Sequence, residues 1–136
     1  MNDLGRFVGA QQDVYDQALA ELRAGSKRSH WMWFVFPQIA GLGRTATAQR
    51  YAIADLAEAR AYLAHPVLGP RLTESARALL EVRDRTATQI LGTPDDLKLR
   101  SSMTLFAHAA DDPAVFRAVL DRYYGGEDDP LTLQRL

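Results

Sequence analysis

One decapeptide decides the fold: Ser29-His30-Trp31-Met32-Trp33-Phe34-Val35-Phe36-Pro37-Gln38. It holds both tryptophans of the chain and two of its five phenylalanines. Six consecutive large apolar side chains, residues 31–36, cannot all face water, so the rest of the chain must pack around them. We call residues 31–36 the aromatic segment. Because polar residues lie at both of its ends, it is either an anchor of the core or the floor of a ligand pocket.

The aromatic segment could form a strand or a helical turn. Its β-branched and aromatic residues favour a strand, but six apolar residues in a row give no periodicity that would decide. A strand also needs a partner, and no other stretch of the sequence predicts one. We therefore expect a short buried helical or extended segment, which Pro37 ends.

Apolar residues at helical spacing predict about six short helices around this segment. The expected ranges are 13–24, 45–54, 55–64, 68–84, 95–109 and 113–124. Thr93 is expected as the N-cap of a helix whose first residue is Pro94. The pairs Asp112-Pro113 and Asp129-Pro130 repeat this helix-start pattern. The sequence therefore predicts an all-α fold, with one compact domain over residues 1–136.

The composition is that of an ordinary globular protein. Of 136 residues, 24% are charged and 47% are hydrophobic, and the formal net charge is −1. No bulk attraction to nucleic acid or to an anionic membrane is therefore expected. The sequence has no cysteine, which excludes disulfides, thiol catalysis and cysteine-bound zinc. Residues 1–9 lack the apolar core of a signal peptide, and no apolar run approaches the ~18 residues of a membrane span. We expect a cytoplasmic protein that is a monomer or a weak dimer.

Several motifs resemble a widespread, mostly bacterial domain family of unknown function. The similarity extends from Arg6-Phe7 to Tyr123-Tyr124-Gly125 and includes the decapeptide, Gly41-Leu42-Gly43 and Asp96-x-Lys98-Leu99-x-Ser101-Ser102-Met103-Thr104-Leu105-Phe106. Members are sometimes labelled calpastatin, although this chain has nothing like the repeats of that disordered inhibitor. The resemblance implies a compact, mainly α-helical domain. It implies no activity and no catalytic residues, because the family has none established.

His30 is the candidate catalytic residue. It lies between Ser29 and Trp31, where an imidazole could act as an acid, a base or a ligand donor. The alternative is a histidine that caps a helix or pairs with a buried carbonyl. Neither a metal nor a cofactor is expected. The three histidines have no partner at i+4, and residues 41–45 lack the lysine spacing of a phosphate loop.

Trp31 and Trp33 are candidate contacts for a planar ligand, because aromatic side chains stack on flat rings. The alternative is packing in the core, and it must hold for at least one of them, since two exposed tryptophans would favour aggregation. We expect one of the two to be buried and the other to line a cleft.

Lys98, Ser101 and Ser102 form the second group of candidate ligand contacts. On the helix predicted over residues 95–109 they share one face, separate from the apolar stripe. A lysine beside two hydroxyls could bind a phosphate or a carboxylate. The alternative is a polar face in which Lys98 pairs with Asp95 across one turn.

These candidates predict a small ligand-binding domain. The expected ligand is an anionic planar, nucleotide-like metabolite in an aromatic pocket with a polar rim. The expected ligand contacts are Ser29, Trp31, Trp33, Gln38, Lys98, Ser101 and Ser102. The two stretches should converge on one cavity, surrounded by His30, Gln38, Lys98 and Ser102. The alternative function is a non-enzymatic protein-interaction module whose aromatic segment is only core.

Overall fold

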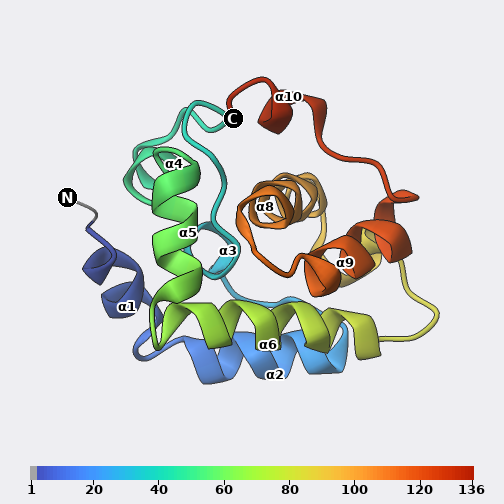
Figure 1. The fold of residues 1–136 in the computed structure, drawn as a ribbon. Helices are drawn as coiled ribbons and strands as arrows, with labels where there is room; N and C mark the ends of the chain where they lie inside the picture. Colours follow the sequence, from blue (N-terminus) through green and yellow to red (C-terminus); the bar gives the residue numbers. More distant parts are fainter. Residues whose placement is uncertain (1–2) are drawn as a thin grey trace.

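The structure is a computed structural model that describes residues 3–136 (Figure 1). Within this range it contains ten helices: α1 (Gly5–Gln11), α2 (Tyr15–Ala24), α3 (Met32–Val35), α4 (Ala46–Arg50), α5 (Leu56–Ala64), α6 (Leu68–Glu81), α7 (Ala87–Leu91), α8 (Asp95–Ala109), α9 (Ala114–Tyr124) and α10 (Pro130–Leu133). No strand forms between residues 3 and 136, where Ile39 and Ile53 make an isolated parallel bridge. The predicted all-α fold is confirmed. None of the helices in the described part of the chain is long and apolar enough to span a membrane.

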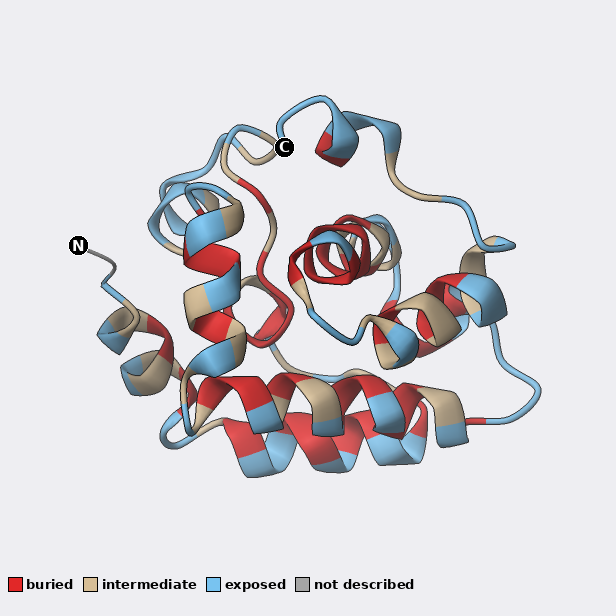
Figure 2. Ribbon diagram, in the orientation of Figure 1, coloured by how far each residue is buried: buried red, intermediate tan, exposed pale blue. Residues whose placement is uncertain are grey.

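Helix α8 lies at the centre of the molecule (Figure 1). Helices α5, α7, α9 and α10 pack against it, while α2 and α6 pack side by side as one edge of the molecule. Every residue from Ser101 to Ala107 is buried, and Figure 2 shows burial on several sides of this helix. Because other helices surround the middle of α8, this helix reaches the surface at its ends.

The aromatic segment forms a short buried helix, α3, with a buried residue at each end. Trp31 and Phe36 are fully buried, and their ring centroids lie 6.3 Å apart. Phe34 is also buried, whereas Trp33 is half-buried and reaches the surface beside α8. The expectation of a short buried segment is confirmed.

The helix count differs from the six or so that were predicted. Helices α1 and α7 have seven and five residues, which is too short for an apolar repeat to be recognised in the sequence. Helix α7 owes its start to a local capping box, in which the Thr86 hydroxyl accepts from the Gln89 N–H and the Gln89 side chain accepts from the Thr86 N–H. The predicted helix over 45–54 ends at Arg50, because the following residues form the bridge with Ile39.

Two predicted helix starts are wrong in detail. Pro113, expected at the first position of its helix, is the N-cap of α9, which begins at Ala114. Pro94 occupies the N-cap of α8 and Asp95 begins the helix, whereas Thr93 and Pro94 were expected at the N-cap and first position. The Thr93 hydroxyl instead donates to Asp96 Oδ2 at 3.3 Å. Asp129 does cap α10 as predicted, accepting from the Thr132 N–H with Pro130 at the first helical position.

Helices α5 and α6 approach each other closely at Gly69. A Cβ atom at this buried position would lie 2.1 Å from the carbonyl oxygen of Leu63, and backbone cannot move away as a flexible side chain can. We expect Gly69→Ala to lower the free energy of unfolding by about 1–3 kcal/mol through overpacking.

Urea denaturation of Gly69→Ala measures this loss, and Gly9→Ala in α1 is the matched control. A Cβ at Gly9 meets nothing within 4 Å, so that variant should gain up to about 1 kcal/mol from helix propensity. Equal effects of the two substitutions would contradict the close approach of α5 and α6.

Candidate functional site

A cavity of about 310 Å³ lies at the N-terminal end of α8. Its walls come from the loop after α3, from the first two turns of α8 with the preceding Pro94, and from Asp129 and Leu131 at the start of α10. The structure brings three of the predicted ligand contacts together here, namely Gln38, Lys98 and Ser101. We call this space the α8 cavity.

The loop that supplies Gln38 is held by the bridge to residue 53. The Ile53 N–H donates to the Gln38 carbonyl at 2.8 Å, and the Ala40 N–H donates to the Ile53 carbonyl at 2.8 Å. Farther along the loop, a Cβ at Gly43 would lie 2.4 Å from the Ala48 Cβ, so the loop also packs tightly against α4. This wall is therefore positioned by the backbone.

Asp129 joins α10 to α8 on the opposite wall. Its Oδ2 accepts from the Ser101 hydroxyl at 2.9 Å and from the Thr132 hydroxyl at 2.6 Å, and its own N–H donates to Thr104 Oγ1 at 2.9 Å. A serine in mid-helix is thus explained by a contact between helices. Ser101 fixes the cavity wall through a hydroxyl that already has partners.

Lys98 belongs to a cluster of two ammonium groups, one carboxylate and two indole rings. Lys98 Nζ lies 3.6 Å from Asp95 Oδ1 and 5.1 Å from the centroid of the Trp33 ring. Lys27 Nζ lies 2.9 Å from Asp95 Oδ2 and 5.2 Å from the centroid of the Trp31 ring. The side chains of Lys27 and Lys98 are 9% and 23% exposed, so both cation–π contacts form with little water between them. The cluster carries a net charge of +1.

Glu21 explains where the first half of the decapeptide lies. This carboxylate is 4% exposed and accepts from the Ser29 hydroxyl at 2.6 Å, from the Arg28 N–H at 2.8 Å and from Trp31 Nε1 at 2.9 Å. Burial alone would raise the pKa of Glu21, but hydrogen bonds, the strongest from Ser29, lower it to about 2. The buried Glu21 carboxylate therefore holds Ser29 and Trp31 in place, in the segment between α2 and α3.

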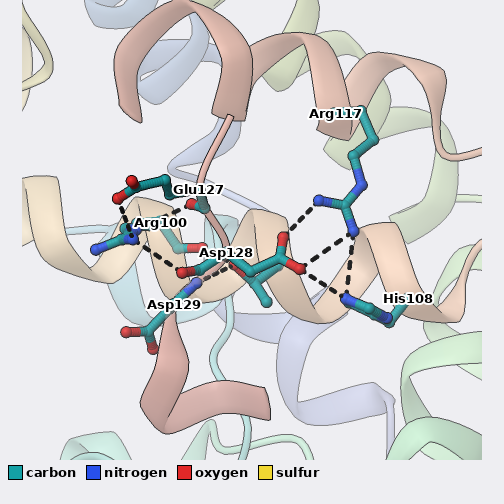
Figure 3. A network of polar contacts seen from close by, with 7 residues as sticks. Arg100, His108, Arg117, Glu127, Asp128 and Asp129 are labelled. Atoms are coloured by element: carbon teal, nitrogen blue, oxygen red, sulfur yellow. Dashed lines mark hydrogen bonds and ion pairs between the residues drawn. The ribbon is translucent and has the colours of Figure 1, made fainter. Parts of the chain in front are cut away.

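The remaining wall of the α8 cavity is fixed by a network around the segment between α9 and α10 (Figure 3). Arg100 donates from Nε to the Glu127 carbonyl at 3.1 Å and from a terminal nitrogen to the Asp128 carbonyl at 2.8 Å. The Asp128 carboxylate pairs with Arg117 and lies 3.1 Å from His108 Nε2. Burial raises the pKa of Asp128, but the hydrogen bonds of Arg117 and His108 lower it below its ordinary value.

The comparisons with known proteins agree with this fold. A family model described as "Protein of unknown function (DUF1810)" matches residues 1–136. The chain belongs to this family. The crystal structure of the conserved hypothetical protein Rv1873 from Mycobacterium tuberculosis is similar to it, with 55% sequence identity and a TM-score of 0.97 over 98% of this chain and 96% of the other. No protein of curated function matches the chain.

The other predicted site residues lie outside the walls of the α8 cavity. His30 is exposed at the start of the aromatic segment. Ser102 is fully buried on α8, and its hydroxyl has no hydrogen-bond partner among residues 3–136. Trp33 reaches the site indirectly, through its contact with the Lys98 ammonium. The two conspicuous stretches of the sequence therefore meet at Trp33 and Lys98.

Several residues of the site were not predicted. They are Lys27 in the charged cluster, and Leu42, Pro94, Leu97, Arg100, Asp129 and Leu131 in the cavity wall. The pairing of Lys98 with Asp95 across one turn, the alternative given for the polar face, does form. Leu97 could have been identified from the sequence, because a leucine that lies off the apolar stripe of α8 should face solvent. In the structure its side chain is 60% exposed. Leu131, 59% exposed on the four-residue helix α10, had no such signal in the sequence.

A larger cavity of about 620 Å³ runs along the outer face of α6. Its cations, such as Arg77, alternate with carboxylates, such as Glu74. None of the predicted site residues contributes to it. No group of three or more His, Asp or Glu that could hold a metal ion occurs within residues 3–136. The α8 cavity is therefore the better candidate site despite its smaller size.

Proposed function

We propose that the α8 cavity binds a small anionic planar metabolite. The observation that carries the proposal is that Lys98 lines a largely apolar cavity, with its ammonium shared between Asp95 and the Trp33 ring beside it. Ligand sites typically combine an apolar lining with a few polar groups that fix orientation, and their volumes begin at about 300 Å³. Nucleotide-like compounds are one member of this ligand class.

Each part of the cavity has a role in this proposal. The flat body of the ligand packs against Leu42, Pro94, Leu97 and Leu131. The anionic group pairs with Lys98, whose single carboxylate partner is shared with a second lysine. The Gln38 side chain supplies an amide that orients the ligand from the opposite loop. His30 lies outside the cavity, so the proposal is one of binding and contains no catalytic step.

Lys98→Met tests the proposal. A panel of planar anions is screened by thermal shift on the full chain, because a bound ligand raises the melting temperature by mass action. Loss of one charged contact costs about 1.5–3 kcal/mol, so a ligand of the wild-type protein should bind Lys98→Met roughly 10–100-fold more weakly. A ligand that binds both proteins equally would contradict the role of Lys98.

The second candidate function is the protein-interaction module, which the exposed leucines of the C-terminal segment favour. Leu133 and Leu136 are each 41% exposed, and neither lines the α8 cavity. A protein partner would cover them, whereas a small ligand would not touch them. The double variant Leu133→Ser, Leu136→Ser is therefore the matched control, and its ligand affinity should equal that of the wild-type protein.

A further inference from the structure

We propose that the ligand of the α8 cavity is a compact aromatic monocarboxylate, rather than a nucleotide or another phosphate ester. This inference rests on the proposed function and specifies the chemical class of its ligand. Three features of the cavity support it: the charge that is available for the ligand, the Asp129 carboxylate in its wall, and the volume of the cavity.

The positive charge available in the cavity is small. Asp95 is shared by two ammonium groups, at 2.9 Å from Lys27 Nζ and 3.6 Å from Lys98 Nζ. This cluster therefore presents one net positive charge. A carboxylate carries one negative charge and matches it, whereas a phosphate monoester carries about −1.5 to −2 at pH 7.

The other cation in the wall is already bound to protein. Arg100 donates to the carbonyls of Glu127 and Asp128, and its terminal nitrogen also lies 3.5 Å from the Glu127 carboxylate. The guanidinium group of Arg100 thus faces the segment that leads to α10. It cannot form the two parallel hydrogen bonds with which arginine recognises phosphate.

The Asp129 carboxylate in the cavity wall repels a second negative charge. The Asp129 side chain lines the cavity and accepts three hydrogen bonds, from Ser101 and Thr132. A ligand with a single anionic group can place it beside Lys98 and its apolar ring elsewhere. A phosphate with two charges would add like-charge repulsion from Asp129.

The volume and lining favour a ring with one substituent. About 310 Å³ is at the lower end of the range for ligand pockets, about 300–1,000 Å³. A base, a sugar and a phosphate together need more room than a fused ring with a carboxylate. The lining side chains Leu42, Leu97 and Leu131 offer apolar surface that suits the face of a ring better than a ribose.

The test is an amide NMR titration of the full chain with four probes: indole-3-carboxylate, 2-naphthoate, the uncharged indole-3-carboxamide and AMP. We expect the two carboxylates to shift the amides of residues 38–43, 95–101 and 129–131. They should bind at least tenfold more tightly than AMP, and indole-3-carboxylate at least tenfold more tightly than the carboxamide. In Lys98→Met the difference between carboxylate and carboxamide should disappear, while Lys98→Arg should retain it.

The outcomes separate this inference from the proposed function. If AMP shifts the same amides and binds as tightly as the carboxylates, the ligand class is wrong and the proposed function stands. Equal affinities for indole-3-carboxylate and its carboxamide would overturn the charge argument without depending on any variant. If none of the four probes shifts amides of the α8 cavity, the proposed function fails and this inference fails with it.

Discussion

Glu21→Gln is expected to lower the free energy of unfolding by about 3 kcal/mol at pH 7. The Glu21 carboxylate is 4% exposed and accepts hydrogen bonds from Ser29, Arg28, Trp31 and Gln17. Hydrogen bonds to a charged group contribute about 1.5–3 kcal/mol each. An amide of the same shape keeps one acceptor oxygen, but it places an NH₂ group where the second oxygen accepted.

The same contact makes stability depend on pH in a defined window. The pKa of Glu21 falls from 4.5 to about 2 in the folded state. A lowered folded-state pKa means that the stabilisation is complete above about pH 5 and is lost as the pH falls towards 2. The loss for this one group is about 3 kcal/mol. Glu21→Gln should lack this part of the acid sensitivity.

Urea denaturation at pH 7, 5 and 3 measures both effects. The wild-type protein should approach the stability of Glu21→Gln as the pH falls. The matched control is Glu81→Gln at the exposed end of α6, where the carboxylate forms no ion pair with residues 3–136. That variant should follow the wild-type curve throughout. Parallel curves for wild type and Glu21→Gln would show that Glu21 does not hold the loop.

The sequence predicted best those helices that are determined by residues within the helix itself. Helix α8 spans the predicted range, Asp95 to Ala109, because acidic residues at its start and a long apolar stripe both lie within the helix itself; only the roles of the two residues before it were wrong. Helix α1 has two buried residues, Phe7 and Gln11, so its sequence carries too little periodicity to predict it.

The site was predictable only in part, because its geometry depends on contacts between distant residues. Lys98 was recognised from its place on the polar face of α8, and Asp95 was identified as a helix-start acid and as the alternative partner of Lys98 across one turn. The pairing of Asp95 with Lys27 joins residues far apart in the sequence and leaves no periodic pattern. The same holds for Glu21, which looks like an ordinary acid of an amphipathic helix and yet anchors Ser29 and Trp31.

The aromatic segment leads to the second large effect, that of Phe36→Ala. Phe36 is fully buried and packs against Trp31 at 6.3 Å between ring centroids. Removing a buried phenyl ring loses its transfer free energy and leaves a cavity, which together cost about 3–5 kcal/mol. Since small domains are stable by about 5–15 kcal/mol, the variant should be close to the limit of folding, with a melting temperature roughly 10–20 °C lower.

Leu97→Ala is the matched control for Phe36→Ala, because it removes a large apolar side chain that is 60% exposed. Its stability should stay within about 0.5 kcal/mol of the wild type, while its ligand affinity should fall, because Leu97 lines the α8 cavity. Calorimetry of the two variants therefore separates the residues that build the core from those that build the site. If Phe36→Ala melts within a few degrees of the wild-type protein, packing of the aromatic segment contributes little to the stability of the fold. The walls of the α8 cavity must then be held by α8 and the bridge at Ile53 alone.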